Sequence, residues 1–212
     1  MDGYASEKEQ LEAIKNWFKA NGKSLLTGLL LGAALLLGGR TWLSYQDSQA
    51  VRVSDQYQQM LMEVEQGETE AAMERGSRLV EEHGDSPYAT LTALTLARLK
   101  LDSGDGAGAR LYLQRVMDRA FDEGLKNLAR VRMARLELAQ GDAQAALEAV
   151  KTVQSPAFQG VLGELRGDIF LALSRKDEAR AAYVAALAVA EGGIARTRLE
   201  MKLDELGSAD GA

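Results

Sequence analysis

The strongest constraint on the fold is an apolar run, SLLTGLLLGAALLLGG, which fills residues 24–39 without a charged side chain. Lys23 precedes it and Arg40 follows it. In a bilayer every backbone N–H and C=O needs a partner within the segment, so a run of Leu, Ala and Gly is expected to be helical. A span takes about 20 residues, a length that the helix reaches if it continues to Tyr45. The sequence therefore predicts one transmembrane helix over residues 24–45.

Two other interpretations account for this run less well. A cleaved signal peptide has a short basic region before its apolar part and a small-residue cleavage site after it. In this chain 23 residues come first, and Arg-Thr-Trp-Leu-Ser-Tyr follows. A buried core helix would have a polar face, which the run lacks. Aromatic residues on both sides suit the two interfaces of a membrane; they are Trp17, Phe18, Trp42 and Tyr45.

The cations that flank the run predict its orientation. Four lysines lie on the N-terminal side, against Arg40 and Arg52 on the other. Lys and Arg are enriched on the cytoplasmic side of a span. This bias places the N-terminus in the cytoplasm and residues 46–212 across the membrane. The four lysines are Lys8, Lys15, Lys19 and Lys23.

Residues 1–23 are expected to form a cytoplasmic amphipathic segment. Leu11, Ile14 and Phe18 recur on one helical face, with charges opposite. The pattern leaves two placements open, one along the membrane surface and one as a solvated continuation of the span.

Composition limits what the remaining chain can do. Residues 1–45 carry five basic and four acidic residues, which leaves 20 basic and 27 acidic residues, a net charge of −7, for residues 46–212. Such a domain is a poor candidate for nucleic-acid binding, which needs a basic footprint. There is no cysteine, so disulfides, thiol nucleophiles and cysteine metal sites are excluded. With only two prolines and abundant Ala, Leu, Glu and Arg, an all-α domain is predicted.

Turn-forming residues interrupt this domain at regular places, and segments of helical periodicity lie between them. Short turns between such segments produce antiparallel helix pairs. The helix that leaves the membrane is expected to continue to Gln66. The predicted breaks are at residues 67, 84–87, 104–106, 124, 141–142, 155–156, 175–177 and 192–193.

The helix pairs repeat along the chain. An acidic residue follows the turn within each pair at intervals of 37, 37 and 35 residues, and an alanine comes four residues later. Glycine precedes the first three of these acids, but Lys176 precedes the fourth. We expect the alanines to pack where the two helices of a pair touch. The acids are Glu68, Asp105, Asp142 and Asp177, and the alanines are Ala72, Ala109, Ala146 and Ala181.

This pattern resembles the tetratricopeptide repeat, which has a period of about 34 residues with turn glycines, contact alanines and a terminal proline. The resemblance implies a TPR-like α-solenoid over residues 46–206. A C-terminal capping helix is predicted at residues 194–206, because Leu199, Leu203 and Leu206 lie on one stripe. Residues 207–212 are expected to form a flexible tail. A plain helical bundle remains the alternative.

Two segments resemble the YfgM family of ancillary SecYEG translocon subunits. They are EQLEAIKNWFKANGKSLLTGLLLG near the N-terminus, followed by Trp42, and LRGDIFLALSRKDEARAAYVAAL at residues 165–187. The resemblance implies a single-pass bacterial inner-membrane protein, with its N-terminus cytoplasmic and its repeat domain periplasmic. It also implies contact with the SecYEG translocon and with periplasmic chaperones such as PpiD.

The expected role is therefore that of an interaction protein rather than an enzyme. It would associate with the Sec translocon and pass emerging secreted proteins to periplasmic chaperones. A scaffold for another cell-envelope complex is the alternative, and a membrane-anchored enzyme is a more distant one. His83, the only histidine, adjoins Gly84 without a nucleophile signature. No phosphate-binding glycine motif occurs, and no metal, cofactor or small-molecule substrate is expected.

Two surfaces are candidates for binding. Gly28, Gly32 and Gly39 lie close to one line on the span, where small residues let transmembrane helices approach each other. Membrane lipid would surround the rest of the span. A basic helix within the acidic domain is a candidate protein-binding face, although an ordinary charged surface is the simpler interpretation. Its residues are Lys126, Arg130, Arg132 and Arg135.

Overall fold

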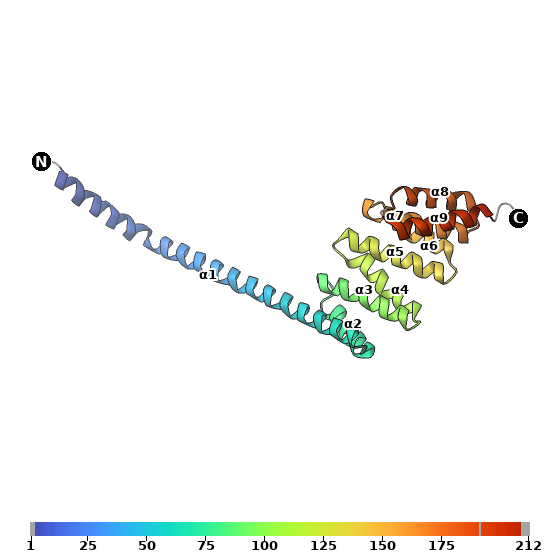
Figure 1. The fold of residues 1–212 in the computed structure, drawn as a ribbon. Helices are drawn as coiled ribbons and strands as arrows, with labels where there is room; N and C mark the ends of the chain where they lie inside the picture. Colours follow the sequence, from blue (N-terminus) through green and yellow to red (C-terminus); the bar gives the residue numbers. More distant parts are fainter. Residues whose placement is uncertain (1–2, 191, 209–212) are drawn as a thin grey trace. The chain divides into compact units, whose positions relative to one another are not determined.

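The structure is a computed structural model that describes the backbone of residues 3–190 and 192–208. Within this range it describes every side chain except those of residues 3–8, 25, 38, 40–48 and 208. All regular elements of the described part are helices, which confirms the predicted all-α class (Figure 1). The chain divides into two compact units, Met1–Arg52 and Val53–Ala212.

The helices follow the predicted breaks closely. There are two exceptions. Gly124 lies inside a helix because the turn comes earlier, at residues 120–122, and the fourth turn within a pair comes at residues 173–175 instead of 175–177. The elements are α1 (Gly3–Glu65), α2 (Thr69–Glu82), α3 (Pro87–Asp102), α4 (Gly106–Arg119), α5 (Glu123–Ala139), α6 (Ala143–Val150), the 3-10 helix η1 (Pro156–Phe158), α7 (Gln159–Ala172), α8 (Lys176–Ala188) and α9 (Gly193–Ser208).

The first unit is the N-terminal part of α1. No described helix is, by itself, long and apolar enough to cross a membrane, but two segments of α1, Glu9–Ser24 and Leu26–Leu37, meet that criterion together. They meet at an angle of 48°, at the boundary predicted between the amphipathic segment and the apolar run. Next to the bend, the Thr27 hydroxyl donates to the carbonyl of Lys23 at 2.8 Å, a bond of the kind that bends helices. The side chains of Arg40, Trp42 and Tyr45, expected at the membrane edge, lie outside the described ones.

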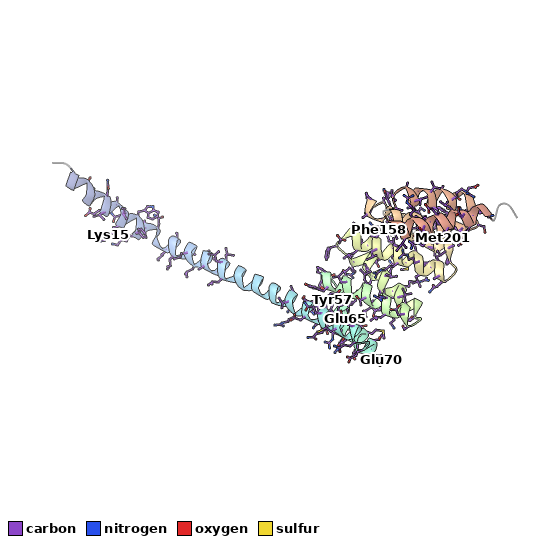
Figure 2. The ribbon with its side chains drawn as sticks, viewed as in Figure 1. Lys15, Tyr57, Glu65, Glu70, Phe158 and Met201 are labelled. Atoms are coloured by element: carbon purple, nitrogen blue, oxygen red, sulfur yellow. The ribbon has the colours of Figure 1, made fainter. Side chains whose placement is uncertain are left out.

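The second unit consists of antiparallel helix pairs. The end of α1 packs on α2, where Met60 lies against Gly76 and Glu63 pairs with Arg75. Likewise α3 pairs with α4, α5 with α6 and α7 with α8, while α9 packs on α8. Tyr57, on the last part of α1 (Figure 2), packs against Tyr88 of α3, with ring centroids 5.8 Å apart and the ring planes tilted by 43°. The predicted capping helix is confirmed, because α9 buries Leu199 and Leu206. It ends at Ser208, and residues 209–212 of the predicted tail are not among the described residues.

The turn within each pair has one geometry. One residue of the turn adopts a positive φ, 78° at Gly67, 80° at Gly104, 86° at Gly141 and 61° at Ser174. The next residue then donates its N–H to the carbonyl five residues earlier, as Glu68 does to Glu63 at 2.9 Å. This Schellman arrangement satisfies carbonyls that the helix end leaves unpaired.

Ser174 corrects the predicted repeat register. In the fourth pair the turn lies at Ser174 and Arg175, not at Lys176 and Asp177. The contact alanine is therefore Ala179, which is fully buried, and Ala181 is exposed. The predicted register relied on glycine as the marker of each turn, and the fourth turn has serine in the left-handed conformation instead. The other predicted contact alanines are confirmed, since Ala72, Ala109 and Ala146 are fully buried.

Acidic residues begin three of the helices, as their favourable interaction with the helix dipole predicts. Asp105 accepts the N–H of Gly108 at 2.7 Å, Asp122 that of Leu125 at 2.8 Å and Asp142 that of Ala145 at 2.8 Å. Each bond satisfies a donor that the first turn of a helix leaves free. Asp122 therefore marks the turn that the sequence placed at Gly124.

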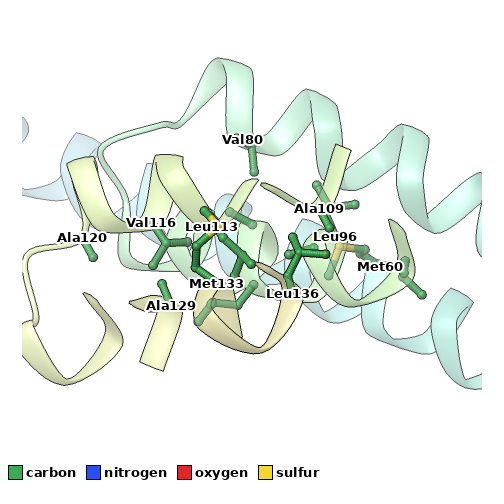
Figure 3. Packing of buried hydrophobic residues seen from close by; sticks show 14 of the residues in the cluster. Met60, Val80, Leu96, Ala109, Leu113, Val116, Ala120, Ala129, Met133 and Leu136 are labelled. Carbon is green, nitrogen blue, oxygen red and sulfur yellow. The ribbon is translucent and has the colours of Figure 1, made fainter. Parts of the chain in front are cut away.

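The core of each pair contains a contact between residues sixteen positions apart, one on each helix. In the first pair Met60 is large and its partner Gly76 small, so that a Cβ at Gly76 would lie 2.8 Å from Met60 Sδ. In the fourth pair the sizes are reversed. Gly167 faces Tyr183, and a Cβ there would lie 2.2 Å from the ring. The same positions are occupied by Ala97 and Leu113 in the second pair and by Ala134 and Val150 in the third. Figure 3 labels Leu113.

We predict that Ala146→Leu destabilises the second unit whereas Ala181→Leu does not. Ala146 has no exposed surface, so the larger side chain must displace its neighbours, at a cost of about 1–3 kcal/mol. Ala181 is exposed, and surface changes stay within about 0.5 kcal/mol. Thermal unfolding of the full chain in detergent measures both. Equal midpoints for the two variants would contradict a register in which Ala146 is a contact residue and Ala181 is not.

Candidate protein-interaction surface

In α3 and α5, the first helices of the two middle pairs, one stripe of side chains lies outside the core. Its positions follow helical spacing in α3 and recur 37 residues later in α5, and all are partly or fully exposed. In a repeat array the first helices line the inner, concave side. We call this stripe the first-helix surface. It consists of Leu91, Thr95, Arg98 and Asp102 in α3, and of Leu128, Arg132, Arg135 and Ala139 in α5.

The four basic residues predicted on α5 separate into two groups. Lys126 donates to Glu123 at 2.7 Å, and Arg130 to Asn127 at 2.7 Å, so both are neutralised or bonded near the start of the helix. Arg132 and Arg135 lie on another side of α5, because they follow Arg130 by two and five residues and each residue turns the helix by about 100°. Only these two belong to the first-helix surface.

Arg132 and Arg135 form a cluster with Arg98 of α3. The Arg132 guanidinium donates to the carbonyl of Leu94 at 3.3 Å. Burial lowers the pKa of Arg132, and the positive charges of Arg98 and Arg135 lower it further. Among the described side chains the one carboxylate paired with this cluster is Asp102, 3.6 Å from Arg98. We call Arg98, Arg132 and Arg135 the arginine cluster.

Two hollows flank the arginine cluster. The one beside Arg135 has a volume of about 420 Å³ and the one beside Arg98 about 370 Å³. Both combine apolar walls with charged side chains. The first is lined by Arg135, Leu138, Ala139, Val161, Glu164, Leu165, Asp168 and Arg198, and the second by Val64, Thr69, Arg98, Leu99, Asp102 and Ser103.

The far wall of the larger hollow is an ion-pair network that attaches α9. Arg198 donates two hydrogen bonds of 2.7 Å to the Glu164 carboxylate. Lys202 lies 2.6 Å from Asp168, which also accepts the hydroxyl of Tyr183 at 2.6 Å. Burial raises the pKa of Tyr183, and the Asp168 carboxylate raises it further. The acids of this wall are therefore already paired, and the network leaves no excess negative charge opposite the arginine cluster.

A third cavity, of about 740 Å³, lies where α6 gives way to α7. The helix α6 is short, and the connection that follows it is longer than the other turns between pairs. Gly163, Phe170 and the exposed small residues of α8 line much of the cavity. It lies apart from the first-helix surface and contains no unpaired charged cluster.

In the first unit the predicted glycine line has open surroundings. A Cβ added at Gly28, Gly32 or Gly39 would meet no atom within 4 Å. The described leucines of the apolar run are 60–76% exposed, so this segment of α1 offers an apolar surface on every described side. They are Leu26, Leu29, Leu30, Leu31, Leu35, Leu36 and Leu37.

The helix pairs define a helical-repeat protein, a class whose fold points to a role in protein interaction. Residues 15–208 match the family described as a tetratricopeptide repeat-like domain. Two solved structures of a Podosopora anserina kinesin light chain with TPR-like repeats share the fold, with TM-scores of 0.58 and 0.56 and identities of 18% and 19%. Each alignment covers 76% of this chain and 88% of that chain.

Curated relatives narrow the class. An ancillary SecYEG translocon subunit of Escherichia coli (strain K12) is 30% identical over 97% of this chain and 99% of its own length. Subunits of the same name from Haemophilus influenzae and Aggregatibacter actinomycetemcomitans are 26% identical, over 85% and 94% of this chain and 88% and 97% of their own lengths. The chain belongs to this family of TPR-like proteins, and the resemblance noted in the sequence is confirmed.

Fold and family point to a non-enzymatic role in protein interaction. His83 follows the last residue of α2, with its Nε2 4.0 Å from Glu82. In the part of the chain that the structure describes, no three His, Asp or Glu side chains come together as a metal site would require.

Sequence reasoning missed Arg98 and the contact between Gly167 and Tyr183. Both left a signal. Arg98 precedes Arg135 by the same 37 residues that separate the two turns. Ala179 and Tyr183 match the A-x₃-aromatic element of the tetratricopeptide pattern, which would have fixed the register of the fourth pair.

We predict that Glu164→Gln weakens the attachment of α9 and flattens the acid dependence of stability. Hydrogen bonds from Arg198 hold the pKa of Glu164 below its usual value of 4.5. Because the folded-state pKa is lowered, the stabilisation is complete above the unfolded-state pKa and is lost as the pH falls through the folded-state value. We expect a loss of about 1 kcal/mol at neutral pH, discounted for exposure of the pair.

Thermal unfolding of the full chain at neutral pH and at about pH 3 measures this effect. Glu200→Gln on α9 is the matched control, because Glu200 and its partner Arg196 are each 51% exposed and lie 3.9 Å apart. If Glu164→Gln and the unchanged chain lost equal stability on acidification, the ion pair would not be what attaches α9.

Proposed function

We propose that this chain is an inner-membrane interaction protein that associates with the Sec translocon and presents its repeat domain to proteins emerging in the periplasm. The observation that carries the proposal is the match over nearly the whole chain to relatives named ancillary SecYEG translocon subunit. The match covers 97% of this chain, so the N-terminal segment and the repeats both have counterparts in the relative.

The apolar run supports attachment to the membrane. Its leucines are exposed along the helix, and exposed apolar side chains of this density require lipid or another apolar helix around them. The bent pair of helical segments has the length and composition of a span. Lys15, Lys19 and Lys23 on the N-terminal side favour a cytoplasmic N-terminus and a periplasmic repeat domain.

An anchor of this kind would concentrate the repeat domain near the exit of the translocon. Tethering converts a weak encounter into an intramolecular one, with an effective concentration of about millimolar for short linkers. The first-helix surface could then receive emerging chains and pass them to chaperones such as PpiD. The resemblance to the family is the basis for proposing this transfer to chaperones.

Gly28, Gly32 and Gly39 would supply the contact within the membrane. No described atom lies within 4 Å of a Cβ placed at any of these glycines. Small residues allow transmembrane backbones to approach closely, and van der Waals packing drives association where the hydrophobic effect is absent. A partner helix of the translocon would fit this line.

We predict that the full chain, purified from native membranes, recovers SecYEG subunits and that Gly28→Ile with Gly32→Ile lowers this recovery several-fold. Isoleucine is apolar enough for insertion, but it separates the two backbones. Ala33→Ile with Ala34→Ile is the matched control, since it enlarges two small residues off the glycine line. Recovery is measured by quantitative mass spectrometry at equal expression.

The absence of SecYEG from the unchanged chain's partners would refute the proposed function and favour a scaffold for another envelope complex. Undiminished recovery with the glycine variant would refute only the packing role of the glycines, and attachment would then run through the flanking segments or the repeats.

A further inference from the structure

We propose that the arginine cluster of Arg98, Arg132 and Arg135 binds an extended acidic segment of a partner protein. This inference rests on the proposed function, because it names the chemistry that the repeat domain recognises. The glycine line in the membrane and the arginine cluster would then serve different contacts, the first with the translocon and the second with a chain outside the membrane.

The cluster differs from most of the inter-helix cations of this domain. Elsewhere in the second unit, several arginines and lysines that join helices are held by carboxylates, whereas Arg115 and Arg166 donate to backbone carbonyls. Arg75 contacts Glu63 at 2.6 Å, and Arg110 contacts Glu137 at 2.7 Å. With 27 acidic residues against 20 basic ones in residues 46–212, carboxylates are abundant. Their scarcity at the arginine cluster therefore leaves a local excess of positive charge on an acidic domain.

Keeping three guanidinium groups together costs free energy. Arg132 is partly buried and bonded to a backbone carbonyl, and the charges of Arg98 and Arg135 act on it. Asp102 offsets part of this repulsion at 3.6 Å from Arg98, on a pair that is mostly exposed. A carboxylate from a ligand would relieve the repulsion and accept two parallel hydrogen bonds from a guanidinium. Part of the binding free energy would thus come from relief of the repulsion among the arginines that is already present in the free protein.

The position of the cluster favours an extended chain over a compact ligand. Arg98 lines the smaller hollow and Arg135 the larger one, so a ligand that enters both must cross the cluster. Side chains of an extended segment that point the same way are about 7 Å apart. Alternating acidic and apolar residues would place carboxylates on the arginines and apolar groups against Val64 and Leu99 on one side and Val161 and Leu165 on the other.

The charge of the whole domain argues against a nucleic acid as the ligand. A polyanion would contact surface beyond the cluster, and the net charge of −7 over residues 46–212 would repel it. A short acidic peptide meets the cluster alone. Its binding would depend on salt, as expected for exposed charges screened over about 8–10 Å.

Fluorescence anisotropy with the full chain in detergent tests the proposal. The probes are a short fluorescein-labelled peptide in which glutamate alternates with leucine and the same peptide with glutamine at each glutamate. We expect the glutamate peptide to bind at least about tenfold more tightly, a difference of about 1.4 kcal/mol, and to weaken as salt is raised.

Arg98→Gln with Arg135→Gln should weaken the glutamate peptide at least about tenfold. Both arginines are exposed, so the variant is expected to fold, and its thermal midpoint confirms this. Lys126→Gln with Arg130→Gln is the matched control. It removes the same total charge, two positive charges, but both from side chains of α5 that lie outside the first-helix surface, and it should change the affinity by less than about twofold.

The proposal would be overturned if neither peptide bound or if both bound equally. An equal loss of affinity in the control variant would also overturn it, and so would tighter binding of a short single-stranded DNA. Recovery of SecYEG is scored separately on the same proteins. If the unchanged chain recovers SecYEG but shows no selectivity for the glutamate peptide, the acidic-segment inference fails while the proposed function stands. If it recovers no SecYEG, the proposed function fails whatever the peptides do.

Discussion

The repeat domain depends on one contact inside each helix pair, between residues sixteen positions apart. The two sides of this contact are complementary in size, Met60 with Gly76 at one end of the array and Gly167 with Tyr183 at the other. Both combinations let the helices cross closely, because a large side chain on one helix fills the space that a small residue leaves on the other. The larger residue can thus lie on either helix of the pair. Keeping the summed volume of the two side chains matters more than keeping either residue.

This contact also determines which side chains of the first helices remain exposed. The first helix of each pair turns one side to its partner and others to the neighbouring pairs, and in α3 and α5 the stripe of the first-helix surface stays partly or fully exposed. Repetition at 37 residues places Arg98 and Arg135 at equivalent positions, and Arg132 adds a third guanidinium between them in sequence. The array ends at α9, where Arg198 and Lys202 neutralise Glu164 and Asp168. Positive charge therefore remains in the middle of the surface and is cancelled at its end.

Sequence alone predicted the helical class, the turns and most of the pairing, because glycines with positive φ and acidic caps are local features. It placed the fourth turn two residues late, since serine adopts the left-handed conformation at residue 174 and offers no compositional sign of doing so. It grouped Lys126 and Arg130 with Arg132 and Arg135 because all are basic and close in sequence. Their separation depends on Glu123 and Asn127, which bond the first two. The arginine cluster joins two helices, and only packing brings such residues together.

Site-specific photo-crosslinking of the full chain in native membranes tests the central claim, that the first helices and not the second helices face the partner. Crosslinking residues would replace Arg135 or Thr95 on the first-helix surface, and Leu111 of α4 or Val184 of α8, which are 73% and 53% exposed, on the second helices. The account predicts adducts with other proteins from Arg135 and Thr95 and few from Leu111 and Val184. Adducts that form mainly from the second helices would contradict it.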